Sequence, residues 1–130
     1  MYAHIRGTVS EIFPDRVVLE ACGVGYELYC SAQTRKNLHV GDETKLYVHF
    51  HISLSQDVMA LYGFETEEER AMFRRLIGVT RVGPKLALSV LSALRVSDIA
   101  GAILTKNAAA FDKVPGMGRK TAARVLLELK

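Results

Sequence analysis

The first half of the chain alternates between apolar and polar residues with a period of two. The alternation runs through residues 46–54 (LYVHFHISL) and 24–30 (VGYELYC), and the segment 16–21 (RVVLEA) is rich in strand-forming residues. Because successive side chains of a strand point to opposite faces, this pattern is typical of half-buried strands. Turn residues separate the segments, at Pro14-Asp15, Gly23 and Gly41-Asp42.

The order of these segments predicts a small barrel. Residues 31–40 (SAQTRKNLHV) have room for one short helix between the third strand and the long strand that follows. We therefore predict three strands, a short helix and two more strands that end near Phe64. This is the order of an OB-fold, a small five-stranded β-barrel.

The second half changes to the helical period of 3.6 residues. Thr66-Glu67-Glu68-Glu69 has the form of a capping box, with Thr66 at the N-cap and Glu69 three residues later. The helix that it opens continues through apolar residues at Met72, Phe73 and Leu76. Three further helices are expected, marked by Pro84 in a first turn, by Ser97 as an N-cap and by residues 107–111.

The pattern as a whole predicts an α+β protein with two domains. Residues 1–64 are expected to form the OB-fold β-barrel, and residues 65–130 an all-α domain. A chain of 130 residues is long enough for two small domains. No linker rich in Pro, Gly and Ser separates them, so the barrel is expected to pass directly into the helices near Gly63-Phe64.

A repeat dominates the helical half. Residues 76–95 (LIGVTRVGPKLALSVLSALR) align without a gap to residues 111–130 (FDKVPGMGRKTAARVLLELK), 35 positions later. After the shared glycines, Gly83 and Gly118, apolar residues recur in both copies with the spacing i, i+3, i+4 and i+7, which marks one face of a helix. The repeat therefore indicates a pseudo-symmetric pair of helix–turn–helix units packed on each other.

The turn before each of these helices has the residues of a phosphate site. A glycine lets the backbone approach a ligand closely, and the first N–H groups of a helix lack partners and favour anions. Lys85 and Lys120, each two residues after its glycine, add positive charge on the same side. Such contacts hold a sugar-phosphate backbone without reading bases. A plain glycine turn is the better explanation of a single copy, but the duplication with lysine at the same offset favours the phosphate site.

Charge is distributed unevenly and supports a polyanionic partner. Residues 1–64 contain five Lys/Arg and seven Asp/Glu, whereas residues 65–130 contain twelve and seven, within a net charge of +3. No apolar run approaches the roughly 18 residues of a membrane span, and the first residues lack a signal-peptide pattern. Cys22 and Cys30 have neither disulfide nor metal-ligand spacing, so we expect two reduced, packed thiols in a cytoplasmic protein.

Short motifs from both halves resemble one known family. VPGMGRKTA (114–122) resembles the helix-hairpin-helix motif of DNA-binding proteins, and RVGPKLALSVL (81–91) resembles a second copy. With the barrel and LYGF (61–64) in front, the whole chain resembles the RuvA family of Holliday-junction-binding subunits. The resemblance implies a tandem helix-hairpin-helix domain that binds DNA and an OB-fold domain that oligomerises and lies at the junction centre.

The same resemblance implies partners and an activity. Members of the RuvA family form a homotetramer that holds four-way junction DNA open and flat, for branch migration in recombination and repair, and the resemblance implies the same for this chain. The resemblance also implies that a hexameric ATPase partner, RuvB, supplies the motor, and that the chain itself is non-catalytic. No Walker-type loop is present, so no nucleotide cofactor is expected. Family members continue through a flexible linker into a small third domain that contacts the motor, so we expect this chain, ending at Lys130, to be a fragment.

Particular residues match the family's functional positions. The DNA phosphate-binding positions are Thr80, Arg81, Val82, Gly83 and Lys85 in the first hairpin, and Gly116, Gly118, Arg119, Lys120 and Arg124 in the second. Gln56 and Asp57 match an acidic pin, two adjacent acids that lie near the tetramer axis and repel phosphates. Gln56 therefore removes one carboxylate from the pin. Arg81 stands where the first hairpin has glycine in the family, so its backbone is expected to avoid strain while its charge adds a phosphate contact.

Other functions fit parts of the pattern. The second hairpin also resembles that of DNA glycosylase/lyases, in which Lys120 would be a Schiff-base nucleophile, although such enzymes need a further aspartate and lack a leading barrel. A generic duplex-binding module of a repair enzyme fits the hairpins alone. His49 and His51 share a strand face but are too few for a metal site, so no metal is expected. Most of the tyrosines are expected to be core or interface residues, with base-stacking platforms of the kind that some OB-folds use as the alternative; they are Tyr2, Tyr26, Tyr29, Tyr47 and Tyr62.

Overall fold

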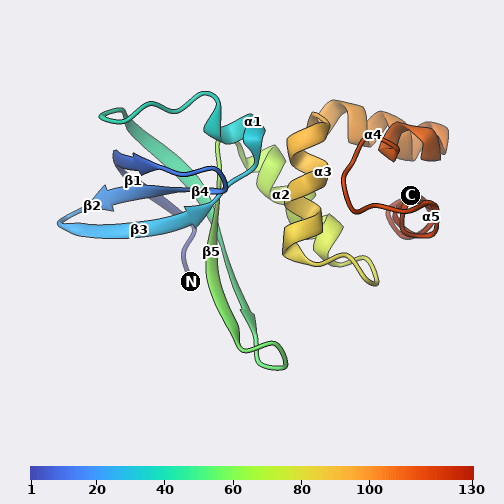
Figure 1. The fold of residues 1–130 in the computed structure, drawn as a ribbon, viewed down its shortest axis with the longest axis horizontal. Helices are drawn as coiled ribbons and strands as arrows, with labels where there is room; N and C mark the ends of the chain where they lie inside the picture. Colours follow the sequence, from blue (N-terminus) through green and yellow to red (C-terminus); the bar gives the residue numbers. More distant parts are fainter. The chain divides into compact units, whose positions relative to one another are not determined.

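The computed structural model describes residues 1–130 as two compact units (Figure 1). The units are Met1–Arg70 and Ala71–Lys130. The first contains all the β-strands and the second is helical, which confirms the predicted α+β class. Helix α2 (Glu67–Ile77) begins in the first unit and continues into the second.

Five strands of the first unit form a closed barrel. They are β1 (His4–Ile12), β2 (Arg16–Ala21), β3 (Val24–Tyr29), β4 (Glu43–Ser53) and β5 (Val58–Phe64), with the short helix α1 (Ala32–Arg35) between β3 and β4. Their order around the barrel is β1-β2-β3-β5-β4, and β4 pairs with β1 to close it. Every pair is antiparallel except β3 with β5. The predicted order of strands and helix is confirmed.

The period of two in the sequence is the period of burial in the barrel. Within the barrel wall the apolar positions of the alternating segments are buried, as at Leu28, Leu46 and Val48, whereas most of the residues between them are partly or fully exposed. This removal of apolar surface from water stabilises the barrel. The fully buried apolar side chains of the strands are Val9, Val17, Leu19, Leu28, Leu46, Val48 and Phe64. The alternation does not mark burial beyond the wall, since Ile52 and Leu54, towards the end of the β4–β5 hairpin, are exposed.

The two cysteines lie in different surroundings. Cys22 and Gly23 form a two-residue turn between β2 and β3, with φ values of 52° and 81°. Two positive φ values in succession characterise the tight turn that suits twisted antiparallel strands. This turn leaves Cys22 exposed, so the expectation that both thiols are packed is wrong for Cys22. Cys30 is buried, and burial raises the pKa of its thiol to about 12.

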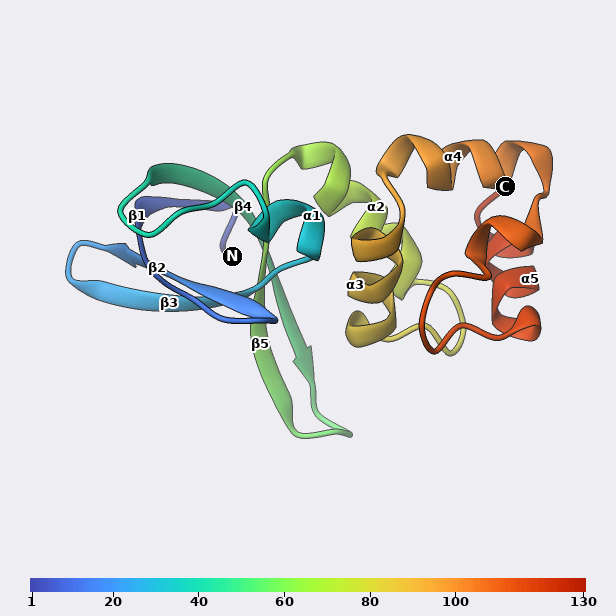
Figure 2. The ribbon, with the colours of Figure 1, turned by 45° about the horizontal axis from the view of Figure 1, so that its top comes forward.

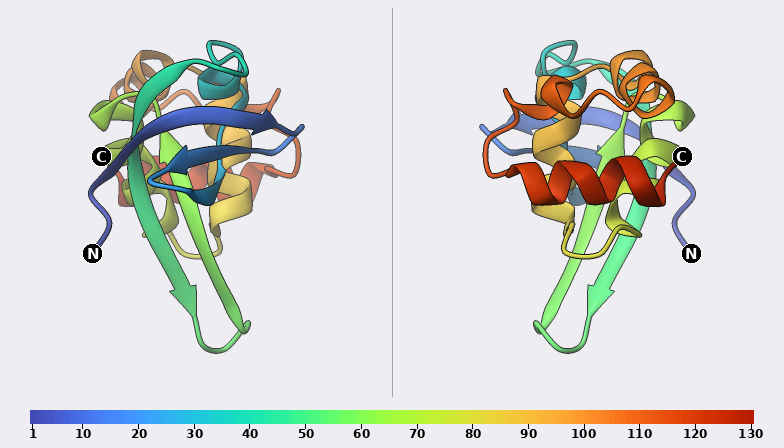
Figure 3. Two further views of the ribbon diagram at one scale, coloured as in Figure 1. Left: turned by 90° about the vertical axis from the view of Figure 1, so that its left-hand side faces the viewer. Right: turned by 90° about the vertical axis from the view of Figure 1, so that its right-hand side faces the viewer.

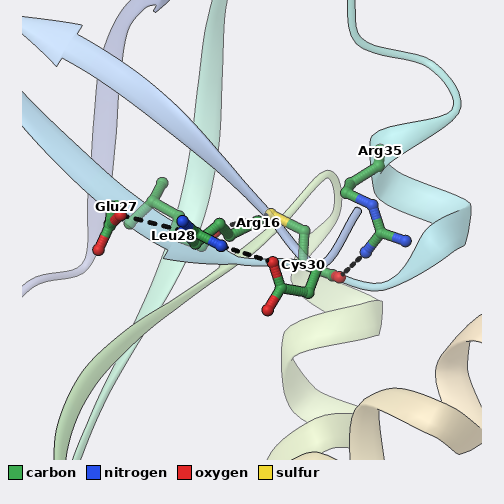
Figure 4. A network of polar contacts seen from close by, with 6 residues as sticks. Arg16, Glu27, Leu28, Cys30 and Arg35 are labelled. Carbon is green, nitrogen blue, oxygen red and sulfur yellow. Dashed lines mark hydrogen bonds and ion pairs between the residues drawn. The ribbon is translucent and has the colours of Figure 1, made fainter. Parts of the chain in front are cut away.

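Polar contacts hold the chain where β3 passes into α1 (Figure 4). The Nε of Arg16 donates to the carboxylate of Glu27 across the β2–β3 pair, at 3.0 Å. The guanidinium of Arg35 in α1 donates to the carbonyl oxygen of Cys30. The thiol of Cys30 donates to the carbonyl of Leu28 at 3.3 Å. These contacts fix the path from the strand into the helix.

β4 and β5 extend beyond the barrel as a two-stranded hairpin. β1 pairs with β4 only as far as Tyr47, and β3 pairs with β5 only at Leu61 and Tyr62. β4 and β5 remain paired with each other to Ser53↔Val58. The hairpin projects from the barrel in every view (Figure 1, Figure 2 and Figure 3). Its turn, residues 54–57, is therefore held away from the barrel wall.

A buried carboxylate joins the start of α2 to α1. The Oγ1 of Thr66 accepts the backbone N–H of Glu69 at 3.1 Å, so Thr66 is the N-cap as predicted. The carboxylate of Glu69, which was expected to return to Thr66, instead accepts hydrogen bonds from the hydroxyls of Ser31, at 2.7 Å, and Thr34. All three side chains are buried. A carboxylate removed from water requires such donors, and α1 supplies them.

The second unit is built from the rest of α2 and four further helical segments. They are α3 (Pro84–Ala93), α4 (Val96–Thr105), the 3-10 helix η1 (Ala108–Phe111) and α5 (Arg119–Glu128). Pro84 opens α3 as predicted, and the expected fourth helix is the single turn η1. Ser97 does not cap α4, because the helix already begins at Val96. The N–H of Arg95 donates to Asp98, which closes that end of α4.

The helical repeat buries one apolar face of each helix. The largest fully buried side chains of this unit come from α2, α3, α4 and η1, namely Phe73, Leu76, Leu91, Ile99 and Phe111. Ala87 and Val90 of α3 and their equivalents in α5, Ala122 and Val125, are buried as well. No single helix is long and apolar enough to cross a membrane. Only α3 and α4 taken together, with a 98° bend between them, reach that length and composition.

Candidate nucleic-acid interface

The two predicted hairpins have the same backbone hydrogen bonds, 35 residues apart. In the first hairpin the N–H of Val79 donates to Leu76 and that of Val82 to Val79, both at 3.0 Å. In the second the N–H of Val114 donates to Phe111 at 3.1 Å, and that of Met117 to Val114 at 3.3 Å. The repeat in the sequence is therefore a repeat in the backbone.

The helix that follows each hairpin begins in the same way. Gly83 is the N-cap of α3, with φ −92° and ψ 177°, and Gly118 is the N-cap of α5, with φ −85° and ψ 172°. Neither helix receives a side-chain hydrogen bond at its cap. The first N–H groups of both helices therefore have no side chain to satisfy them. Backbone donors at an open helix N-terminus are well suited to a phosphate oxygen.

The fold itself does not require glycine at either cap. A Cβ atom built on Gly83 or Gly118 would meet no protein atom within 4 Å. The φ values of both residues are negative and lie in the extended region, which any residue adopts. Neither internal packing nor backbone strain therefore explains why Gly83 and Gly118 lack a side chain. Close approach of an external group to the backbone explains it.

Lysine at these helix starts works against the stability of the helices. Lys85 and Lys120 are the second residues of α3 and α5, and neither helix has an acid in its first turn. Cations are unfavourable near the positive end of a helix dipole. α2, by contrast, has Glu67, Glu68 and Glu69 in its first turn, as the dipole favours. The positive charge at the N-termini of α3 and α5 is therefore unfavourable for the helices themselves but favourable for binding an external anion.

The two hairpin turns lie at one end of the helical unit. Figure 2 shows the turn before α3 and the turn before α5 together at the lower edge of the unit. A Cβ on Gly116, in the second turn, would lie 3.8 Å from Cδ1 of Leu86, in the first turn of α3. The structure thus brings the candidate residues of both hairpins together on one surface.

The candidate residues are not equivalent within this surface. Arg81, Lys85, Lys120 and Arg124 are exposed and take part in no ion pair. Arg119 forms an ion pair with Asp112 at 3.0 Å, so its charge is partly neutralised. The side chain of Val82 is buried, with 4% of its surface exposed, so only its backbone is available to DNA.

Arg81 has a left-handed backbone, which corrects the expectation that it avoids strain. Its φ is 70°, close to the 83° of its repeat equivalent Gly116. The hairpin geometry requires a positive φ at this position in both copies. Arginine reaches that region at a cost of about 1–3 kcal/mol, which glycine does not incur. The exposed charge of Arg81 is thus retained at the expense of stability.

Replacing Arg81 with glycine is expected to stabilise the fold and weaken DNA binding at the same time. The free energy of unfolding should rise by about 1 kcal/mol, because the relief of strain at the positive φ is partly offset by the greater conformational freedom of glycine in the unfolded chain. The slope of log K for DNA against log salt should become shallower by about 0.9, because one phosphate contact is lost. Thermal unfolding and titrations at several salt concentrations measure the two effects. Arg81→Lys retains charge and strain and serves as the control; an unchanged slope in Arg81→Gly would show that Arg81 makes no contact.

Glu128 supports the candidate interface, although the sequence pattern did not indicate it. It lies in the last turn of α5, and its Oε1 accepts the backbone N–H of Thr80 at 3.2 Å. Beside it, Arg75 donates to the carbonyl of Leu129 at 2.7 Å. These two contacts brace the first hairpin against the end of α5. The second hairpin has Pro115 in place of Thr80, which has no N–H and needs no such partner.

Glu128 is therefore expected to hold the first hairpin in its binding geometry. Glu128→Ala should lower the free energy of unfolding by about 1 kcal/mol, the usual contribution of one hydrogen bond, and should weaken DNA binding. Glu128→Gln removes the same negative charge but keeps an acceptor, so the difference between the two variants isolates the hydrogen bond. Chemical denaturation and DNA titration measure both. Identical DNA affinities for the two variants would contradict this role.

The candidate pin lies on the other unit, apart from the hairpin residues in the chain. Gln56 and Asp57 are exposed at the turn of the β4–β5 hairpin, where Asp57 has a φ of 53°. The projection of this hairpin beyond the barrel makes its turn accessible. His49 and His51 lie on β4 with ring centroids 6.0 Å apart. No group of three or more His, Cys, Asp or Glu side chains is placed to hold a metal ion.

Comparisons with known proteins agree with this architecture. Residues 1–63 match the model of the RuvA N terminal domain, and residues 73–130 match that of the SAM-like helix-hairpin-helix tandem. The chain is 46% identical over 131 residues to a protein of Chlorobium luteolum, 41% identical over 130 residues to one of Staphylococcus epidermidis and 38% identical over 130 residues to one of Alkaliphilus oremlandii. Each relative is named Holliday junction branch migration complex subunit RuvA.

These matches cover all of this chain but only part of each relative. The chain spans 64% of the Chlorobium luteolum and Staphylococcus epidermidis proteins and 66% of the Alkaliphilus oremlandii protein. The two domain models follow each other in the order of the barrel and the helical repeat. The chain therefore belongs to the RuvA family, of which it contains the N-terminal barrel domain and the tandem helix-hairpin-helix domain.

Proposed function

We propose that this chain is a structure-specific DNA-binding scaffold that recognises four-way junctions without reading their sequence. The observation that carries the proposal is the pair of hairpins whose cap glycines serve no purpose inside the fold. Each hairpin offers unpaired N–H groups and one exposed lysine to a phosphate. Phosphate contacts position DNA but carry no sequence information.

Recognition of a junction requires several such phosphate-binding hairpins to contact the DNA at the same time. The named relatives are subunits of a branch migration complex, and we infer that this chain assembles as a homotetramer whose symmetry matches the four DNA arms. Weak contacts on each subunit then sum through multivalency. A hexameric RuvB-type ATPase would drive the movement of the junction, and the scaffold would supply no catalysis of its own.

The pin at the end of the β4–β5 hairpin would act at the centre of the junction. Asp57 supplies one carboxylate per subunit, which repels phosphates at the crossover. Gln56 is neutral, so the negative electrostatic field at the centre of the junction is weaker than with two acids.

Gln56→Glu is expected to increase the opening of base pairs at the centre of the junction. The fluorescence of 2-aminopurine at the crossover should rise in Gln56→Glu and fall in Asp57→Asn, and no difference between the two variants would exclude a charge-based pin.

Competition between DNA shapes tests the proposed function directly. A labelled four-way junction is bound at moderate salt and challenged with unlabelled junction or with linear duplex of equal total length. We expect the junction to compete much better, and light scattering to show four chains on one junction. If duplex competes as well as junction, the junction-specific function is excluded and the chain is a generic duplex-binding module.

A DNA lyase that uses Lys120 is the competing function. Its support is the turn motif alone. Lys120 is exposed, whereas nucleophilic lysines are commonly activated by desolvation in an apolar pocket. Borohydride trapping on DNA with an abasic site is expected to give no covalent adduct. A trapped adduct that disappears in Lys120→Ala would establish the lyase instead.

A further inference from the structure

A groove lies where the β4–β5 hairpin leaves the barrel. Its volume is about 640 Å³, within the range of pockets that hold small organic ligands, roughly 300–1,000 Å³. The walls come from the segment before β1, from β3 and from both strands of the hairpin. We call it the aromatic groove, because its ring-bearing lining residues are Tyr2, Tyr29, Phe50 and Tyr62.

The four rings form two contacting pairs. Tyr2 meets Phe50 edge to face, with ring centroids 6.0 Å apart and an interplanar angle of 62°. Tyr29 and Tyr62 lie 5.8 Å apart at 39°. Aromatic pairs at these separations hold one another in defined orientations. The other two tyrosines are occupied elsewhere, since Tyr26 packs against the barrel core and the ring of Tyr47 lies under cationic side chains.

The charge of the groove excludes a phosphate as its occupant. No lysine or arginine is among the lining residues, and the two charged ones are carboxylates, Glu27 and Asp57. Glu27 is paired with Arg16 at 3.0 Å, whereas Asp57 takes part in no ion pair. The phenol of Tyr62 is neutral at physiological pH, and burial raises its pKa further. The groove therefore favours a flat, uncharged, aromatic group over an anion.

We propose that the aromatic groove binds an unpaired nucleobase released at the centre of the junction. The proposal rests on the proposed function, since the groove and the pin share the β4–β5 hairpin and Asp57 lines one while forming part of the other. A carboxylate at the end of the hairpin turns phosphates away and leaves the bases facing the groove. Aromatic side chains then stack on the base face, which every base presents. The groove stabilises the open state of the crossover, because it binds a base that has lost its partner where the pin keeps the strands apart.

Photo-cross-linking on the intact chain tests where the base goes. 5-Iodouracil is placed at the crossover of a four-way junction, or ten pairs out along an arm as the control, and the bound complex is irradiated. We expect cross-linked peptides that contain Tyr2, Tyr29, Phe50 or Tyr62 from the crossover probe only. Cross-links confined to the helical unit would overturn the proposal, as would groove cross-links of equal yield from the arm probe.

Ring removal gives an independent measurement. The junction is compared with one that carries unpaired thymines at its crossover. The wild-type chain should prefer the second, and Tyr2→Ala with Tyr29→Ala should reduce that preference by at least about fivefold, the lower end of the effect of one stacking ring. Tyr2→Phe with Tyr29→Phe keeps both rings and should retain the preference. Circular dichroism shows whether the alanine variant folds, and cross-linking of the wild-type chain decides if it does not.

The outcomes separate this proposal from the proposed function. If the wild-type chain selects junction over duplex but gives no groove cross-link, nucleobase binding in the groove is disproved and the proposed function still stands. A chain that does not select the junction disproves the proposed function, and cross-linking of oligothymidine containing 5-iodouracil then tests the groove by itself. If the alanine variant changes the mass of the assembly in light scattering, the groove is a contact between subunits and the nucleobase proposal is wrong.

Discussion

Placing a methyl group on both cap glycines, by Gly83→Ala and Gly118→Ala together, is expected to remove most DNA binding and leave the fold intact. The new Cβ atoms meet nothing in the protein and lie on backbone with ordinary φ. They would occupy the space through which a phosphate approaches the N–H groups. A hydrogen bond to a charged group contributes about 1.5–3 kcal/mol, so losing one at each hairpin should weaken binding by roughly 10²- to 10⁴-fold.

A third glycine provides the matched control for this experiment. Gly101 lies inside α4, has no positive φ and also has no protein atom within 4 Å of a built Cβ. Gly101→Ala should leave DNA binding unchanged and stabilise the helix, because alanine has the higher helix propensity by about 0.8–1 kcal/mol. Thermal unfolding verifies the fold of each variant and junction titration measures binding. Wild-type affinity in a folded Gly83→Ala/Gly118→Ala chain would exclude close phosphate approach at these turns.

Removing both hairpin lysines, by Lys85→Ala with Lys120→Ala, is expected to produce the second large loss. Each lysine is exposed and unpaired at a helix N-terminus that lacks acidic residues. Two fewer phosphates neutralised per chain should make the slope of log K against log salt shallower by about 1.8. The helices themselves should gain slightly in stability, since a cation is removed from the positive end of each dipole.

Titrations at several salt concentrations distinguish this effect from a general loss of charge. Lys36→Ala removes an exposed lysine that lies outside both hairpins and provides the control. We expect its effect on the slope to be small. If the double lysine variant keeps the wild-type slope, the lysines do not contact phosphates, whatever its affinity.

The two hairpins should contribute unequally to these losses. α3 begins with Pro84, which has no N–H, whereas α5 begins with Arg119, which has one. The N–H of Thr80 is also occupied by Glu128. The first hairpin therefore has fewer free backbone donors, and the charge of Arg81 offsets part of that difference. Single variants should show a larger affinity loss for Gly118→Ala than for Gly83→Ala.

Local periodicity was enough to predict most of the architecture. The period of two at Leu46 and Val48 and the period of 3.6 after each glycine mark the side of the element that is buried in the fold. The same alternation continues to Ile52 and Leu54, which are exposed because the β4–β5 hairpin leaves the barrel there. The 35-residue repeat placed both hairpins and their lysines correctly. Errors occurred where one local signal competed with another, as at Ser97, which lies inside α4 although it is a good capping residue.

The sequence by itself therefore determined the barrel, the helical repeat and the chemical character of the hairpin turns, because those depend on residues close together in the chain. Only the tertiary structure decided which residues act across long separations. Glu128 contacts Thr80 from 48 positions away in the chain, and the ring of Tyr2, before β1, contacts that of Phe50 in β4. It also decided the left-handed backbone of Arg81, which contradicts the preference of arginine itself. Such features arise when distant segments pack together, and no local pattern of hydrophobic and polar residues records them.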